Sequence, residues 1–407
     1  MLKTTIRRMF SPTLIKQVKK YKALLKAVGT KKIVTSNKYD IYSLHNKHVF
    51  FGYYDLPQFS EDEKKILVHA VPVNAVAGRD NADIGYFDTE DKSFHKICET
   101  AAWSWQQGAR LRWNPINPEQ VIYNDVQDGN YVCRVCDVNK KEIVCTYECA
   151  FYDIDSNFSY GLTLDFSLLQ RLRPGYGYSN LQEEKDETGI EQYDFKNRQK
   201  KMLVKLSDLA NDIPNGKKYE HYINHISIAP SGRYFIFFHL MSPIVGGHWI
   251  NRLIVYDLEN EKYRVLEDKC IVSHYCWKDD DSILVTCCDR DGTEHYRMYD
   301  IHSGAQRPFC EEYLKRDGHP TFIRDKIISD TYPDGNSNQT LFLTSDHGPI
   351  TELAKVFHYP FMTGEKRCDL HPRVSKSKDY VCIDTMAMGR KRSCCIIKIN
   401  GIEFEQV

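Results

Sequence analysis

The chain has 407 residues, enough for one large repeat-built domain or for two to three ordinary domains. Its 55 basic and 55 acidic side chains balance, so the global charge predicts no nucleic-acid partner. No run approaches the roughly 18–20 apolar residues that span a bilayer, and we expect no secretory signal because the first residues lack an apolar core.

Residues 1–38 are a basic segment, with eleven lysines and arginines and no acidic residue. Ser11 followed by Pro12 predicts the start of a helix, and Gly29 predicts its end. Lysines populate one side of this helix, and the other side is apolar. The apolar residues are Leu14, Val18, Tyr21, Leu25 and Val28. Since such a helix can lie on anionic lipid, we expect residues 1–28 to contact a membrane surface; the alternative is docking on the main domain or on a partner subunit.

The fourteen cysteines fall largely within apolar, strand-like runs, and two pairs of them are adjacent in the sequence, Cys287-Cys288 and Cys394-Cys395. This distribution suits reduced thiols better than a disulfide framework. We therefore expect a cytoplasmic protein, peripheral at the inner face of the membrane if the basic helix binds lipid.

One unit recurs through residues 39–407: an apolar run, a polar turn and a second apolar run. Copies lie at 57–70, 111–125, 226–239, 275–288 and 373–385, with fainter ones at 152–166 and 321–331. Each copy is followed by two more strand-like runs, which for the last copy are expected within 394–407. Seven four-stranded units spaced by roughly 40–50 residues are typical of propeller blades. The sequence thus predicts an all-β fold, a seven-bladed β-propeller preceded by the basic amphipathic helix.

The third unit carries a long insertion near 167–190, which includes the sequence RLRPGYGYS. Long loops on a propeller lie on its faces and often carry function. Arginine pairs with carboxylate or phosphate, and tyrosine stacks on sugar rings. We therefore expect Arg173 to be catalytic and Arg171 and Tyr176 to bind substrate. The alternative is an ordinary solvated loop.

Histidine recurs at one register, five residues before the turn, in four successive units. The four are His225, His274, His319 and His371. Because the first strands of all blades run the same way along the central channel, these residues should form a ring at one end of it. Converging imidazoles are suited to binding a divalent cation or to moving protons near neutral pH. The alternative is a Gly-His staple that is hydrogen-bonded within its own blade, for which Gly318-His319 is the candidate.

Other polar residues of the first strands should reach the same channel mouth. As substrate-binding residues there we expect Tyr54, Asp55, Gln107, Arg110 and Arg373. A neutral imidazole at His225 would act as the base, and a positive side chain from the insertion would pair with the substrate.

Over most of residues 48–407 the sequence resembles the oligogalacturonate lyase-like propellers and, more distantly, the TolB-type propellers. The segments that carry the resemblance are WQQGARLRW, INHIS, GHPTF and LHPR, in this order along the blades. The resemblance implies a divalent metal such as Mn²⁺, with His274, His319 and His371 as its ligands. It also implies β-elimination on an acidic sugar, driven by His225 and Arg173, in which the cation acidifies the C–H beside the carboxylate.

The sequence therefore predicts a carbohydrate-active, lyase-like enzyme that takes an acidic glycan or a sugar nucleotide. Two other classes stay open. The basic helix and the reduced thiols favour a glycosyltransferase-like enzyme of capsule or lipopolysaccharide biosynthesis at the cytosolic membrane face. A non-catalytic scaffold for protein binding is the third class, although it has no need of histidines at a channel mouth.

Overall fold

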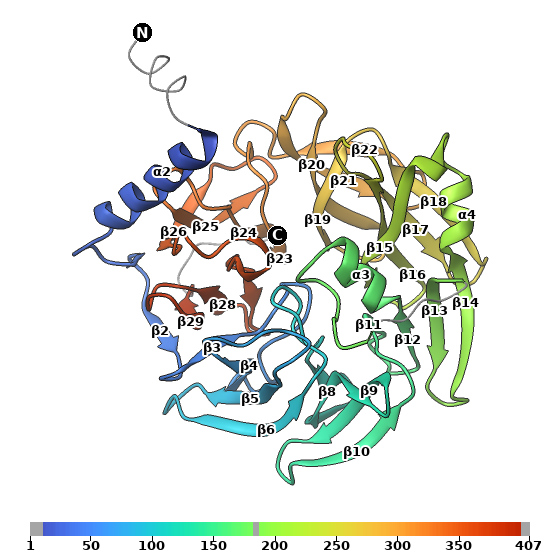
Figure 1. The fold of residues 1–407 in the computed structure, drawn as a ribbon, viewed down its shortest axis with the longest axis horizontal. Helices are drawn as coiled ribbons and strands as arrows, with labels where there is room; N and C mark the ends of the chain where they lie inside the picture. Colours follow the sequence, from blue (N-terminus) through green and yellow to red (C-terminus); the bar gives the residue numbers. More distant parts are fainter. Residues whose placement is uncertain (1–10, 182–186, 400–407) are drawn as a thin grey trace.

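The computed structural model describes residues 11–181 and 187–399. Seven antiparallel sheets surround a central axis like blades, which confirms the predicted seven-bladed propeller (Figure 1). Neighbouring blades pack face to face, so the strands are buried on both sides. Strand β16 of blade four, for example, is a nearly continuous run of aromatic and branched side chains with seven consecutive buried positions.

Each of the first five blades is built from four consecutive strands. Blade one contains β3 (Lys47–Phe50), β4 (Lys65–Pro72), β5 (Ala82–Asp88) and β6 (Phe94–Thr100). Blade two contains β7 (Arg112–Asn114), β8 (Asn117–Gln127), β9 (Asn130–Asp137) and β10 (Glu142–Tyr147). Blade three contains β11 (Asp153–Ile154), β12 (Tyr160–Thr163), β13 (Gly189–Asp194) and β14 (Gln199–Lys205). Blade four contains β15 (Tyr219–Ile228), β16 (Tyr234–Pro243), β17 (Ile250–Asp257) and β18 (Lys262–Glu267). Blade five contains β19 (Ile271–Trp277), β20 (Ser282–Cys288), β21 (Glu294–Asp300) and β22 (Gln306–Phe309).

The last two blades take strands from the N-terminal segment. Blade six contains β23 (Thr321–Ile323), β24 (Lys326–Asp330), β25 (Asn338–Ser345), β26 (Thr351–Phe357) and, as a fifth strand, β1 (Ile33–Val34). Blade seven contains β27 (Arg373–Val374), β28 (Tyr380–Thr385), β29 (Ser393–Lys398) and β2 (Tyr39–Tyr42). The expectation that 394–407 supplies two strands is therefore wrong for the fourth strand of blade seven, which is β2; residues 400–407 lie outside the described residues. The physical reason is closure, since pairing the two ends of the propeller in one sheet joins the ring by hydrogen bonds.

Blade one also differs from expectation, because its first strand is β3 and not the run that starts at 57. After β3 the chain leaves the sheet and pairs again only at Phe59, which bridges to Ile66. The detour begins at Gly52, whose φ of +126° and close approach to the backbone of Gln107 exclude a side chain. It carries two tyrosines, Tyr53 and Tyr54, toward the propeller axis.

The N-terminal helix α2 (Pro12–Lys26) starts as predicted, with the Ser11 side chain accepting a hydrogen bond from the Leu14 amide. It docks on the propeller through small residues, since Ala23 and Ala27 are buried, and Leu24 packs against the cluster around Tyr359. The predicted apolar face, by contrast, is exposed along its whole length. No helix among the described residues is both long enough and apolar enough to cross a membrane.

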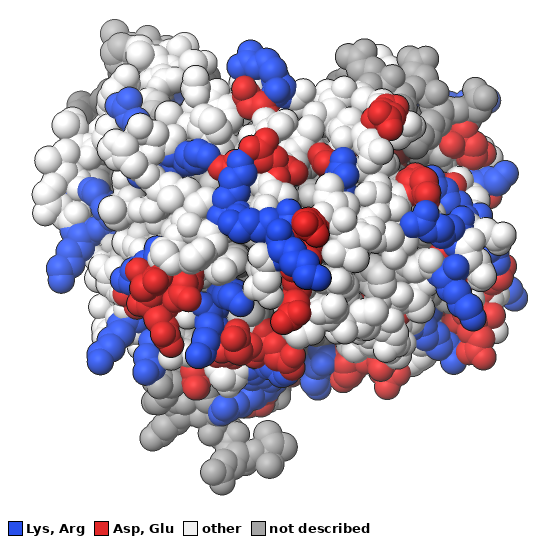
Figure 2. Space-filling model, turned by 90° about the horizontal axis from the view of Figure 1, so that it is seen from below, with Lys and Arg blue, Asp and Glu red and all other residues white. Residues whose placement is uncertain are grey.

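Two short helices and two 3-10 turns lie in the connections: α3 (Phe166–Leu172), α4 (Leu206–Asn211), η1 (Gly216–Lys218) and η2 (Gly364–Lys366). Because strands alternate in direction, the loops from second to third strand and from each blade to the next lie on one face of the propeller. We call this the lid face, because it carries the insertion 164–188 of blade three. The edge-on view shows acidic and basic side chains interspersed, in keeping with the balanced charge (Figure 2). The fourteen cysteines all lie within the described residues, and none of them forms a disulfide.

Candidate functional site

The four histidines of the shared register gather around the ring of Tyr53 at the propeller axis. Their ring centroids lie 5.1 Å (His225), 6.5 Å (His274), 6.1 Å (His319) and 4.9 Å (His371) from that of Tyr53. His319 stands in the middle, with its centroid 4.0 Å from that of His274 and 4.4 Å from that of His371. All four are buried. The structure therefore brings together the residues that the sequence register had aligned.

Three residues at this level have a strained backbone. His225, His371 and Arg110 adopt φ values of 56°, 47° and 53°, in the left-handed region. For residues other than glycine this conformation costs roughly 1–3 kcal/mol and persists only where the surroundings enforce it. Beside His225 the register of β15 against β16 shifts between Asn224 and Ser227. Such irregularities re-aim a side chain, here toward the axis.

The Nδ1 atoms of three histidines are held by oxygen acceptors. His274 Nδ1 lies 3.0 Å from Asp317 Oδ1, and His319 Nδ1 lies 2.7 Å from Asp330 Oδ1. His371 Nδ1 lies 2.7 Å from the carbonyl of Gly52. A proton on Nδ1 leaves the Nε2 lone pair of each ring available, which is how proteins orient metal-binding histidines.

The contact of His319 also bears on the staple alternative. Asp330, on β24 of the same blade, accepts both the backbone amide and Nδ1 of His319. His319 is thus stapled within its own blade, as the Gly-His alternative supposed. The staple uses only Nδ1, however, so it orients the ring without occupying Nε2.

One cluster has the composition and spacing of a metal site. Ligand atoms of His319, Asp369 and His371 all lie within 4.8 Å of one another. The Nε2 atom of His371 is buried and has no hydrogen-bond partner among the described residues. Two imidazoles and a carboxylate suit Mn²⁺ or a similar divalent ion, so the residues present fit the group that the resemblance implied. His274 lies outside this cluster, although its ring touches that of His319.

Sequence reasoning missed Asp369, for which the only signal was its position two residues before His371. The carboxylate of Asp369 is also gripped by Arg367, with Nε–Oδ1 at 2.7 Å and Nη2–Oδ2 at 2.6 Å. Arg367 in turn lies 4.8 Å from the centroid of the Tyr332 ring. Despite burial, the Arg367 guanidinium and the nearby histidines hold the pKa of Asp369 below its usual range, so the carboxylate is charged.

The pKa values of the histidines are shifted in different directions by their surroundings. Burial, reinforced by the neighbouring imidazoles and arginines, lowers the pKa of His225 and of His371 well below the ordinary value. Burial also lowers the pKa of His319, but the carboxylate of Asp330 and two others outweigh it, leaving that pKa above its ordinary value. At neutral pH His225 is therefore a free base, as a proton acceptor must be.

A hydrogen-bond network fixes the backbone at His225. The Tyr152 hydroxyl accepts from Gln107 Nε2 at 2.6 Å and from the His225 amide at 3.1 Å, and it donates to Asn224 Oδ1 at 3.0 Å. Gln107, expected to bind substrate, thus supports His225 through Tyr152. The Nδ1 atom of His225 is buried and has no hydrogen-bond partner among the described residues.

The insertion of blade three covers this cluster, as predicted for a loop on the face. The ring of Tyr176 lies 5.9 Å from that of His225 and 6.3 Å from that of Tyr53. The guanidinium of Arg173 stacks between Tyr176 and Trp249, at 5.0 and 5.1 Å from their ring centroids. Arg171 points away and forms an exposed ion pair with Glu220. Of the two arginines, Arg173 is the one beside the cluster.

The loop is latched to the connection between blades six and seven. Gln106 donates two hydrogen bonds to this connection and accepts none from it: its Nε2 atom donates to the carbonyls of Glu365 and Arg367, both at 2.8 Å. The Gln106 amide also donates to the carbonyl of Gly175 at 3.0 Å. Gly175 itself packs so closely on Glu365 that a Cβ there would lie 2.8 Å from the Glu365 Cβ.

The remaining predicted residues are engaged with partners of the fold. Arg110 forms a bidentate pair with Asp55, at 3.1 and 2.9 Å, and donates through Nε to the carbonyl of Tyr152 at 2.7 Å. Arg373 is buried in blade seven and pairs with Asp384. The Tyr54 hydroxyl donates to the Tyr275 carbonyl at 2.6 Å, and its ring lies 5.3 Å from that of His319. Their assignment to substrate binding stays a prediction, and their contacts favour support of the site.

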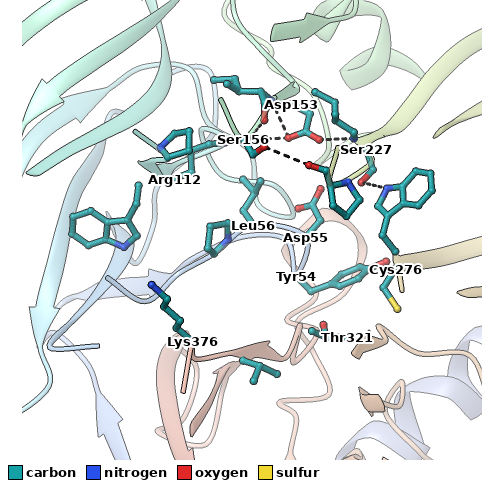
Figure 3. Close-up of a pocket in the computed structure, with 18 of the residues that line it drawn as sticks. Tyr54, Asp55, Leu56, Arg112, Asp153, Ser156, Ser227, Cys276, Thr321 and Lys376 are labelled. Atoms are coloured by element: carbon teal, nitrogen blue, oxygen red, sulfur yellow. Dashed lines mark hydrogen bonds and ion pairs between the residues drawn. The ribbon is translucent and has the colours of Figure 1, made fainter. Parts of the chain in front are cut away.

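Tyr54 and Asp55 also border a cavity at the opposite mouth of the channel (Figure 3). Its volume is about 750 Å³, and its walls carry Trp113, Trp277 and the ion pair of Arg112 with Asp153. The four histidines are not among its lining residues. The tyrosine pair thus stands between this cavity and the histidine cluster.

No known protein family matches the sequence, and neither does any curated protein. Solved structures do match. An oligogalacturonate lyase in complex with manganese gives a TM-score of 0.63 at 12% identity, over 91% of this chain and 98% of that one. The oligogalacturonate lyase of Vibrio parahaemolyticus gives 0.64 at 9% identity, over 92% and 99%. This chain has the fold of oligogalacturonate lyase. TolB of Acinetobacter baumannii matches more distantly, with a TM-score of 0.41 at 15% identity, over 73% and 64%.

Proposed function

We propose that the chain is a carbohydrate-active enzyme that cleaves an acidic glycan by β-elimination at the histidine cluster. One observation carries the proposal: a buried, neutral imidazole, His225, contacts the ring of Tyr53, which also contacts His371 of the group formed by His319, Asp369 and His371. Proton abstraction beside a carboxylate needs such a base together with a positive centre that stabilises the developing charge.

The metal-binding group would consist of His319, His371 and Asp369. A divalent ion bound there would neutralise the substrate carboxylate and acidify the adjacent C–H. The likeness in fold to a lyase solved in complex with manganese supports a divalent ion as the cofactor.

The chain's own residues have distinct tasks. His225 accepts the proton from the carbon beside the carboxylate, a C=C bond forms, and the C–O bond to the leaving sugar breaks. Burial raises the pKa of Tyr53 well above its ordinary value, so its hydroxyl stays protonated and can donate to the leaving oxygen. Arg173 supplies a positive charge to the substrate from the loop above. Since His225 is only 3% exposed, substrate enters after the Tyr176 loop has moved.

The test is elimination on a panel of uronate oligosaccharides, including oligogalacturonate, with and without Mn²⁺. The new double bond is followed by ultraviolet absorbance. We expect His225→Gln to lower turnover roughly 10²–10⁴-fold, as for loss of a general base. Arg171→Gln, on the same loop but paired with Glu220 in solvent, is the matched control and should retain activity. Wild-type protein that eliminates none of these substrates refutes the lyase proposal, and His225→Gln with full activity refutes the base.

A further inference from the structure

The exposed face of α2 is unusual for a helix that is docked on a domain. Its apolar residues are Leu14, Val18, Tyr21 and Leu25, continued by Val28 just after the helix ends, and both Leu25 and Val28 are 72% exposed. A helix that only covered the propeller would turn this stripe inward. Here α2 turns Ala23 and Ala27 inward instead and leaves the larger side chains in solvent. Among the described residues, Tyr21 packs on Phe361 at the edge of the stripe, and Leu14, Val18, Leu25 and Val28 belong to no hydrophobic cluster of the propeller.

Other exposed apolar side chains stand on the same face of the molecule. They are Val73 and Val76 in the β4–β5 loop, Ile244 and Val245 in the β16–β17 loop, and Met388 in the β28–β29 loop. All three loops join a second strand to a third, so they lie on the lid face. The contacts of α2 place it there too, because Lys26 bonds Asn336 in the β24–β25 loop and Tyr21 packs on Phe361. Val245 is 88% exposed at its loop tip.

Positive charge accompanies these apolar tips. Lys16, Lys19, Lys22 and Lys26 are exposed on α2, and no ion pair joins them to a carboxylate within residues 11–181 and 187–399. Arg390 adds a further exposed cation beside Met388, with its guanidinium 5.3 Å from the centroid of the Tyr359 ring under the helix. The sequence before residue 39 holds no acidic residue at all. The helix is therefore complementary to an anionic surface.

We propose that the lid face docks on an anionic lipid bilayer, with α2 lying in the headgroup region and the loop tips beside it. Its apolar residues are separate tips on blades one, four and seven and on the helix. A bilayer surface accepts such separated tips at one level, whereas a protein partner usually buries a contiguous patch. Each lysine near an anionic surface adds to the attraction, so four of them form an effective electrostatic anchor.

The docking surface adjoins the cover of the histidine cluster. Phe361, against which Tyr21 packs, belongs to the connection between blades six and seven. The same connection carries Glu365 and Arg367, which latch the Tyr176 loop through Gln106. A bilayer bound at α2 would thus lie beside the segment that closes the site. The docking itself does not depend on which reaction the site performs.

The test is co-sedimentation of the full chain with phosphatidylcholine vesicles, with and without phosphatidylglycerol. We expect binding only to the anionic vesicles, weakened by added salt because screening reduces the attraction. Leu25→Asp with Val28→Asp, and separately Lys16→Glu with Lys22→Glu, should each lower the affinity at least tenfold. The matched controls are Val144→Asp, an apolar residue that is 56% exposed on the outer strand of blade two, and Lys140→Glu with Lys196→Glu, two exposed lysines in the turns of blades two and three.

The controls should bind like the wild type. Absence of wild-type binding, or helix variants that bind as tightly as the controls, would overturn the proposal. Gel filtration of the same variants tests whether this face binds a second copy of the chain instead of a bilayer. A wild-type oligomer that the helix variants dissociate, with no vesicle binding, would show that the face joins copies of the chain and would equally overturn it.

Discussion

Replacing Arg373 distinguishes a residue that binds substrate from one that supports the fold. Its guanidinium is 2% exposed and donates to Asp384 at 2.7 Å, to Gln58 at 2.8 Å and to the carbonyl of His371 at 2.6 Å. Replacing it with methionine leaves the Asp384 carboxylate, 1% exposed, without a counter-ion. Leaving one partner of a buried pair uncompensated costs about 3–5 kcal/mol. We expect Arg373→Met to lower the free energy of unfolding by that amount.

The measurement is equilibrium unfolding in urea. Arg171→Met is the control, because its pair with Glu220 is exposed and contributes only about 0–1 kcal/mol. Arg373→Met combined with Asp384→Asn should recover part of the loss, since no unpaired charge then remains buried. If Arg373→Met stays within 1 kcal/mol of the wild type but loses activity, the residue serves the substrate and the reasoning from burial is refuted.

Three further predictions concern acid stability, metal affinity and the loop. His69 accepts the Ala109 amide at 2.9 Å, and burial lowers the pKa of His69 to about 4. Between pH 6.5 and 4 the unfolded state therefore binds a proton that the folded state does not, so about 3 kcal/mol of the free energy of unfolding should be lost as the pH falls. Urea unfolding of His69→Gln at several pH values is the measurement, and a free energy of unfolding that depends on pH as in the wild type would contradict this prediction. Asp330→Asn should weaken Mn²⁺ binding about 10–100-fold by calorimetry, and an unchanged affinity would show that this contact does not orient His319. Gly175→Ala should open the loop, because its φ is +96° and the new Cβ would meet Glu365; limited trypsin digestion should accelerate at the loop arginines, and an unchanged rate would contradict the latch.

The ring of histidines could be predicted from the sequence, because every blade repeats the same local order of strand and turn and so places the same position of its first strand at the channel mouth. His225, His274, His319 and His371 could be aligned on their turns without knowing the sheet contacts. Asp369 and Arg367 could not be aligned in this way, because they lie in a connection whose path depends on how blades six and seven pack. The same holds for Asp317 and for Tyr332, which reach the cluster from loops without a repeat.

Two other misses have a different physical origin. The sequence period predicts four strands in the last unit but cannot tell whether the fourth comes from the same end of the chain. The helical spacing of the apolar residues predicted the apolar stripe of α2. It did not predict which side of α2 docks on the propeller. Packing through Ala23 and Ala27 depends on close approach between backbones, which a hydropathy pattern does not register.

The closure of blade seven by β2 has a consequence for synthesis on the ribosome. Tyr39 and Tyr42 pair with Ile397 and Cys394, which lie far later in the sequence, so β2 leaves the ribosome long before its partner strand β29. Strand β1 likewise waits for β26. During that interval both strand edges are open to pairing with other chains. A circular permutant that joins β29 to β2 by a short turn would remove the wait, and its yield of soluble protein should rise relative to the natural order.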